Sequence, residues 1–175
     1  MQTRKTTISI AAYAMLTWAT ASSSHENHAP DKKTAIKKEQ KEWGITGDAK
    51  AVKHTVTLSM SDTMRFTPDK IEVKQGDTIK IMLKNTGAQM HELVIGTKKE
   101  LDEHAALMVK FPTMEHSEPY MAHVAPGKTG EIIWTCNKPG NFDFACLIAG
   151  HYQAGMVGKI TVAASKDDDH SSHKH

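Results

Sequence analysis

The chain has 175 residues, enough for one medium-sized domain with a hydrophobic core of its own. Its 22 Lys and Arg residues nearly balance its 20 Asp and Glu residues, and only 6% of the residues are aromatic. A nucleic-acid-binding surface normally needs a basic excess or aromatic stacking platforms, so we expect no nucleic-acid partner. The unusual feature is 11 His and 10 Met beside 2 Cys, because imidazole and thioether groups are metal ligands.

Residues 1–21 have the features of an export signal. Arg4 and Lys5 form a short positive region, and the mostly apolar run that follows, residues 8–19, is too short to span a bilayer. Ala19-Thr20-Ala21 then matches a small-x-small cleavage site. We predict a signal peptide over 1–21, with an uncleaved anchor as the alternative. The mature protein is expected to be exported and to have no stable membrane insertion.

Residues 22–50 are polar and rich in lysine, and we predict a linker there that docks at most loosely. The following region, 51–164, is predicted to be the folded domain. It contains short runs in which apolar residues alternate with polar ones, separated by turn signals, as in a β-sandwich or barrel. The apolar residues of these runs fall within 52–60, 71–73, 79–83, 93–95, 132–134, 142–146 and 160–162.

One segment breaks this strand pattern. Leu101, Ala105, Met108 and Val109 have helical spacing, so a short helix is predicted around 99–110, inserted between strands. At the other end of the chain, residues 165–175 carry three consecutive Asp residues and three His residues, and this tail is predicted to be disordered.

Four residues form the main candidate metal site. Cys146, His151 and Met156 lie within eleven residues, between the end of one predicted strand and the start of the next, and His91 begins an upstream strand. Two imidazoles and a thiolate in a trigonal plane, with a weak axial thioether, suit both Cu(I) and Cu(II). The spacing therefore predicts one copper ion held by these four side chains.

Strand alternation gives independent support for this site. Phe142 and Phe144 are large and apolar, so their face is expected to be the core, and Cys146 is in phase with them. A buried thiolate needs a compensating charge, which copper supplies. Taken singly, the Cys, a His or the Met would be an ordinary core residue. The joint spacing favours copper ligation.

At this point the sequence resembles the cupredoxins, the blue-copper proteins. The ligand loop is similar in spacing to that of rusticyanin and auracyanin, and residues 155–162 are similar to the end of plastocyanins. The similarity is strongest to periplasmic copper-tolerance cupredoxins of Gram-negative bacteria and covers about residues 45–163. It rests on the segments Met64-Arg-Phe-Thr-Pro-Asp69, Met90-His-Glu-Leu93, Phe111-Pro-Thr-Met-Glu-His116 and Phe144-Ala-Cys-Leu-Ile-Ala-Gly-His151. The resemblance implies an all-β Greek-key sandwich, a mononuclear type 1 copper site and a periplasmic location.

Two positions depart from the pattern of that family. Many cupredoxins have Asn after the first His ligand, where its side-chain amide braces the two ligand loops, whereas this chain has Glu92. Cys136 stands where an aromatic or aliphatic residue is usual. If the turn at 137–140 closes a hairpin, Cys136 lies opposite Asn141 and roughly 16 Å from Cys146 along the partner strand. A disulfide needs Cα atoms within about 7 Å, so we predict that Cys136 is a buried free thiol.

A further hypothesis concerns copper outside the main site. Six potential ligands fall within twenty residues: His104, Met108, Met114, His116, Met121 and His123. Thioether and imidazole groups bind Cu(I) and Cu(II), so this segment is a candidate for weak additional copper. The alternative is that Met108 packs beneath the inserted helix and the His residues are solvated, since no tight spacing defines a geometry.

Two functions use the predicted copper site equally well. One is copper handling that supports copper tolerance, and the other is one-electron transfer between redox partners. For docking of a redox or copper-transfer partner, we expect an apolar rim around the second His ligand, made of Leu147, Ile148, Ala149 and Ala154. Catalysis is not expected, because four protein ligands leave no open position for a substrate. A metal-free adhesion sandwich would leave the Cys–His–Met cluster unexplained.

Overall fold

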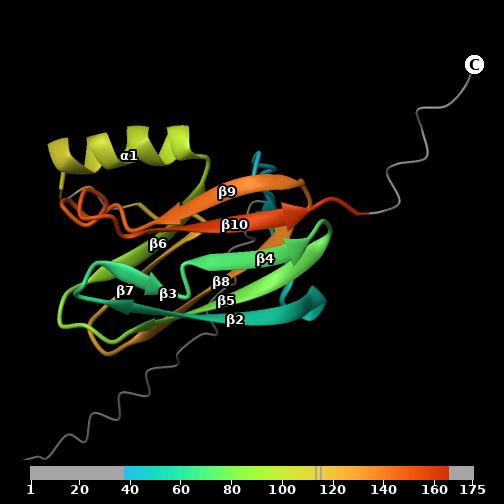
Figure 1. Cartoon of the computed structure of the whole chain (residues 1–175), viewed down its shortest axis with the longest axis horizontal. Coiled ribbons are helices and arrows are strands. Elements are labelled where there is room, and N and C mark those ends of the chain that lie inside the picture. The colour runs from blue at the N-terminus through green and yellow to red at the C-terminus, as the bar shows by residue number, and fades with distance from the viewer. Residues whose placement is uncertain (1–37, 113, 115, 166–175) are drawn as a thin grey trace, which may run out of the picture. The chain divides into compact units, whose positions relative to one another are not determined.

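Two five-stranded sheets pack face to face in the computed structural model, which describes residues 38–112, 114 and 116–165 (Figure 1). The first sheet has the order β1 (Ile45–Thr46), β8 (Thr129–Cys136), β5 (Asp77–Asn85), β2 (Val52–Ser61) and β3 (Arg65–Thr67). The second has the order β4 (Lys70–Lys74), β10 (Val157–Ala163), β9 (Gly140–Ala145), β6 (His91–Gly96) and β7 (Met121–Val124). The predicted signal peptide, residues 22–37 of the predicted linker and the tail from 166 lie outside the described residues.

The core lies between the two sheets and follows the alternation of the sequence. In β5, Ile79, Ile81 and Leu83 are fully buried, and Phe144 of β9 faces them from the other sheet as part of the same hydrophobic cluster. Most neighbouring strands are antiparallel, but β2 pairs with β5 and β4 with β10 in parallel. The predicted all-β sandwich is confirmed.

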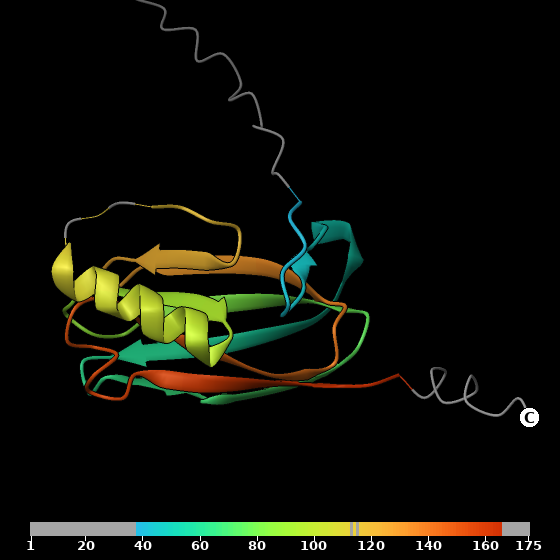
Figure 2. The ribbon, with the colours of Figure 1, turned by 90° about the horizontal axis from the view of Figure 1, so that it is seen from above.

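The inserted helix is α1 (Lys98–Lys110), which begins one residue before the predicted segment 99–110 and ends at the same residue. Thr97 and Glu100 form a capping box that satisfies backbone N–H groups at its start. Leu101, Ala105 and Met108 are buried against β6 and β9 on the outer face of the second sheet, where Figure 2 shows the helix lying across the strands. No helix of the described residues is long and apolar enough to cross a membrane.

The sandwich begins before residue 51, inside the segment predicted as a linker. Trp43 is buried in the main core, and its carbonyl accepts a 2.9 Å hydrogen bond from Nε1 of Trp134. Gly44 has a φ of +131°, and a Cβ there would collide with the backbone of Thr135 and the Trp134 ring. Short β1 then pairs with β8. A single large apolar residue in a lysine-rich run carries no periodicity, which is why the sequence pattern predicted loose docking at most and not a place in the core.

The connection between β8 and β9 also differs from expectation. These strands belong to different sheets, so residues 137–140 cross between the layers and do not close a hairpin. Cys136 therefore lies opposite Asp77 of β5, not opposite Asn141. Both cysteines are free, and burial raises the pKa of Cys136 to about 12. The prediction that Cys136 is a buried free thiol is confirmed, although the predicted hairpin between β8 and β9 is wrong.

Replacing Trp43 by Ala tests whether the docked segment is part of the domain. We expect a loss of about 3 kcal/mol or more in the free energy of unfolding, because the change empties a core position of its largest side chain. Urea denaturation measures it. Val109→Ala, at a position 56% exposed on α1, is the control and should change stability by less than about 0.5 kcal/mol. Equal stability of Trp43→Ala and the wild type would show that residues 38–46 lie outside the cooperative unit.

Candidate metal centre

The predicted ligands meet at one end of the sandwich because three strands of the second sheet bring them there. Cys146 follows β9, Met156 precedes β10 and His91 begins β6. The register places Val94 and Val157 on either side of Ala145, so all three chain segments meet next to Cys146. The loop 146–156 is closed by its own backbone, since the Cys146 N–H donates to the Met156 carbonyl at 3.0 Å.

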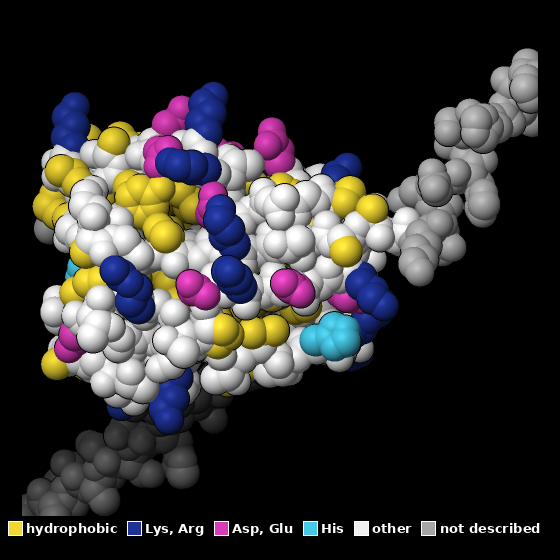
Figure 3. Space-filling model, viewed as in Figure 1, with side chains coloured by type: hydrophobic (Ala, Val, Ile, Leu, Met, Phe, Trp, Pro, Cys, Tyr) yellow, Lys and Arg dark blue, Asp and Glu magenta, His cyan; other side chains and the backbone are white. Residues whose placement is uncertain are grey.

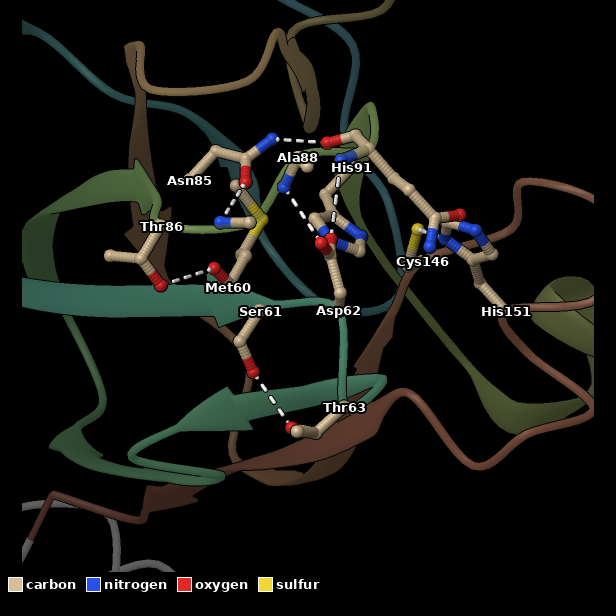
Figure 4. A network of polar contacts seen from close by, with 12 residues as sticks. Met60, Ser61, Asp62, Thr63, Asn85, Thr86, Ala88, His91, Cys146 and His151 are labelled. Carbon is tan, nitrogen blue, oxygen red and sulfur yellow. Dashed lines mark hydrogen bonds and ion pairs between the residues drawn. The ribbon is translucent and has the colours of Figure 1, made fainter.

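Three of the four predicted ligands lie together. Ligand atoms of His91, Cys146 and His151 are all within 4.8 Å of one another, and Cys146 Sγ is 3.3 Å from His151 Nδ1 (Figure 4). The side chains of His91 and Cys146 are fully buried, and His151 is 7% exposed. Met156 is fully buried, and its N–H donates to the His151 carbonyl at 3.1 Å. Its thioether as a fourth ligand stays a prediction.

The chemistry of this group fits a bound metal ion. Nδ1 of His91 is buried without a hydrogen-bond partner, a state that is costly unless a further group is coordinated there. Burial raises the pKa of the Cys146 thiol to about 12, and burial together with His91 lowers the pKa of His151. A neutral imidazole has a free nitrogen lone pair for a metal. A soft cation would also supply the positive charge that a buried thiolate needs.

A carboxylate that the sequence reasoning missed orients the first His ligand. Nε2 of His91 is 3.2 Å from Oδ1 of Asp62, in the turn after β2, so the other ring nitrogen is directed toward Cys146 (Figure 4). Asp62 is itself held by the N–H groups of Ala88 and Gln89 at 2.7 and 3.2 Å. The hydrogen bond from Ala88 is the main cause of its lowered pKa.

Glu92 provides the brace between the ligand loops that the usual Asn would provide. Its carboxylate is fully buried, and Oε1 accepts a 2.8 Å hydrogen bond from the backbone N–H of Leu147. The Glu92 N–H also donates to the Cys146 sulfur at 3.4 Å. Burial raises the pKa of Glu92, and Oε2 lies 2.7 Å from Nε2 of His123. The departure from the family pattern therefore keeps the connection and replaces an amide with a titratable carboxyl group.

Two further side chains hold the outer part of the ligand loop. Nη1 of Arg65, on β3, donates to the Ala154 carbonyl at 2.8 Å. The Tyr152 hydroxyl donates to Asp102 of α1 at 2.6 Å, which links the loop to the helix. These contacts come from elements far apart in sequence, and they fix the loop whether or not metal is bound.

The six residues predicted to bind additional copper separate into three groups: two buried Met residues, three neighbouring His residues and one exposed Met. Met108 and Met121 are buried in a second hydrophobic cluster beneath α1. The rings of His104 and His116 have centroids 4.5 Å apart, and those of His116 and His123 are 5.9 Å apart. The sixth residue, Met114, is 39% exposed.

Comparisons with known proteins agree with this geometry. Residues 9–162 match the family model described as "Cupredoxin-like domain". The chain is 48% identical over 120 residues to the copper-resistant cuproprotein CopI of Rubrivivax gelatinosus, covering 69% of this chain and 73% of that protein. It is 34% identical over 149 residues to CopI of Pseudomonas aeruginosa, covering 69% of this chain and 82% of that protein.

Solved structures show the same fold. Auracyanin from Roseiflexus castenholzii, in a dithionite-reduced crystal structure, superposes with a TM-score of 0.54 at 24% sequence identity. The match covers 64% of this chain and 98% of auracyanin. The sandwich, the His–Cys–His group at its end and the match over most of the chain lead to one conclusion: this protein belongs to the cupredoxin-like family.

Proposed function

We propose that this protein binds one copper ion and serves in bacterial copper tolerance. His91, Cys146 and His151 would hold the ion in their plane, with the Met156 thioether as a weak axial ligand. The observation that carries the proposal is the buried His–Cys–His group, whose ligand atoms lie within 4.8 Å of one another. The CopI relatives, described as copper-resistant cuproproteins, support the tolerance role.

The donor set favours copper over other soft metals. Structural zinc sites in proteins are usually closed tetrahedra of Cys and His, whereas one thiolate, two imidazoles and a long thioether form the type 1 copper arrangement. The pocket is built before metal arrives, because the loop, Asp62 and Glu92 are held by hydrogen bonds within the protein. Little then has to move when the ion changes oxidation state, and four protein ligands leave no open position for catalysis.

The proposed location is the periplasm of a Gram-negative cell. The predicted signal peptide over residues 1–21 and the similarity to the CopI proteins of Rubrivivax gelatinosus, Pseudomonas aeruginosa and Vibrio cholerae support it. Copper arriving from outside the cell would meet the protein there, before it reaches the cytoplasm.

One-electron transfer is the second candidate, and the position of His151 favours it. This imidazole is the ligand nearest the surface, next to exposed Ala149 and Ala154 and half-buried Ile148. Leu147, expected in the same rim, instead packs into the cluster under α1. Figure 3 shows hydrophobic side chains gathered at the end of the molecule to which the loop 146–156 runs in Figure 1. A small apolar rim of this kind suits brief docking of a redox partner.

Cys146→Ser tests the copper site directly. The wild type with added Cu(II) should show a strong thiolate-to-copper absorption band in the visible range, and the variant should lack it because the thiolate is gone. Cys136→Ser is the matched control, since it removes the other buried thiol. A band that survives in Cys146→Ser, or one that disappears in Cys136→Ser, would contradict the proposed ligand.

Growth in copper separates tolerance from electron transfer. A deletion strain should become copper-sensitive, and complementation should succeed with the wild type and fail with Cys146→Ser, because the variant cannot bind the ion through its thiolate. Growth at increasing copper concentrations measures this. Normal copper resistance in the deletion strain, together with a loss of respiratory electron flow, would favour the second candidate.

Copper affinity should fall in acid. With the Cys146 pKa at about 12 without metal, binding releases one proton across the neutral range, so each unit of pH decrease should weaken binding about tenfold. A competition titration with a chelator between about pH 6 and pH 8, corrected for chelator protonation, measures the slope. Cys136→Ser should keep the same slope. A pH-independent affinity would mean that no thiol is deprotonated on binding.

Asp62→Asn tests the carboxylate behind His91. The amide can still accept from the Ala88 N–H but brings no negative charge, so Cu(II) should be stabilised less than before. We expect about a tenfold loss of Cu(II) affinity and a higher reduction potential. Asp69→Asn, at an exposed position outside the site, should change neither quantity. An unchanged potential in Asp62→Asn would show that Asp62 only shapes the turn.

A further inference from the structure

Three imidazoles and a buried carboxylate gather beside the proposed copper site, on elements that the sequence separates. His104 is on α1, His123 is on β7, and His116 is in the connection between them. Their rings form a chain with centroid distances of 4.5 and 5.9 Å. The register of β6 and β7 pairs Glu92 with His123, which brings the carboxylate to the same place.

Two polar atoms in this cluster lack a hydrogen bond although they are buried. They are Oε2 of Glu92 and Nε2 of His116. The Glu92 side chain is fully buried, and its Oε2 lies 2.7 Å from Nε2 of His123. Buried polar atoms of this kind are rare in folded proteins, and each calls for a missing partner. One cation could satisfy both atoms.

The surroundings of His104 favour its neutral imidazole, which is the metal-binding form. Burial, helped by the neighbouring His116, lowers the pKa of His104. Met108 and Met121 belong to the hydrophobic cluster beneath α1, so the groups gathered here are nitrogen and oxygen donors. Three imidazoles and one carboxylate are borderline-to-hard ligands, and among divalent ions such a set binds Cu(II) most strongly.

We propose that His104, His116, His123 and Glu92 form a second metal site, selective for Cu(II), beside the first. It uses neither Cys146 nor any thioether, so its ligands all remain when Cys146 is replaced. The ligand atoms are more widely spread than those of the first site, and binding would draw the His116 ring inward by side-chain rotation. Of the six residues predicted from the sequence to bind additional copper, the proposed site keeps the three histidines. The Glu92 carboxylate is added to them.

The two sites would share Glu92. It follows His91 in the chain, and its other oxygen accepts the N–H of Leu147, next to Cys146. A cation at the second site therefore adds positive charge close to the first. Filling the second site should raise the reduction potential of the first copper, because extra positive charge disfavours Cu(II) relative to Cu(I).

The test uses the full chain with Cys146→Ser as background, which removes the thiolate of the first site. Cu(II) is titrated by calorimetry, and the bound ion is observed by electron paramagnetic resonance. Adding His104→Asn and His116→Asn should remove one equivalent of bound Cu(II) and its nitrogen-coupled signal. His54→Asn, at an exposed position on β2, is the control for nonspecific binding of Cu(II) to surface histidines. It should leave that signal unchanged.

Retention of the same equivalent and signal in the His104→Asn/His116→Asn protein would overturn the proposal, and would assign the cluster to holding α1 in place. The single variant His116→Asn, in the segment between α1 and β7, controls for loss of the fold. It should weaken Cu(II) binding at least tenfold, and its unfolding curve should be unchanged. Failure of the first site would instead appear as a missing visible band in the wild type, so the two proposals fail by different measurements.

Discussion

The structure depends on a sulfur atom that has no contact with water. Cys146 is fully buried at the end of the sandwich, and its thiol has a pKa of about 12 because a bare thiolate could not be solvated there. The Cys146 side chain is therefore stable there in two states, as a neutral thiol or as a thiolate bound to a soft cation. The neighbouring imidazoles of His91 and His151 make the second state available. The burial that keeps the thiol protonated without metal is also what strengthens its bond to an ion.

The surrounding protein holds this pocket with charged groups rather than with neutral ones. Asp62 lies behind His91, and Glu92 joins the two ligand loops through Leu147. The Asp62 carboxylate, whose pKa is lowered by the Ala88 hydrogen bond, favours the more highly charged oxidation state of the metal. A preference for Cu(II) suits a protein that serves in copper tolerance, because such a protein has to hold the ion firmly and does not need rapid electron exchange. Through His123, Glu92 also connects the pocket to the cluster formed by His104, His116 and His123.

Local patterns in the sequence were enough to predict much of the molecule. The spacing of Cys146, His151 and Met156 defines a single loop, and the apolar period of 99–110 defines α1. Contacts between distant segments could not be read in this way. Asp62 looks like an ordinary turn residue, and its bond to His91 spans 29 positions. Trp43 sits alone in a polar run, and the passage of the chain from β8 to β9 across the layers resembles a hairpin turn. Each of these depends on how the sheets pack.

X-ray absorption at the copper edge of the Cu(II)-loaded His104→Asn/His116→Asn protein tests whether the buried thiol binds copper, because it reports the atoms bound to the first ion alone. We expect one short bond to sulfur and two bonds to imidazole nitrogen, from Cys146, His91 and His151. A first shell of nitrogen and oxygen without sulfur would contradict it, since copper would then be held elsewhere and the buried thiol would be only a core residue.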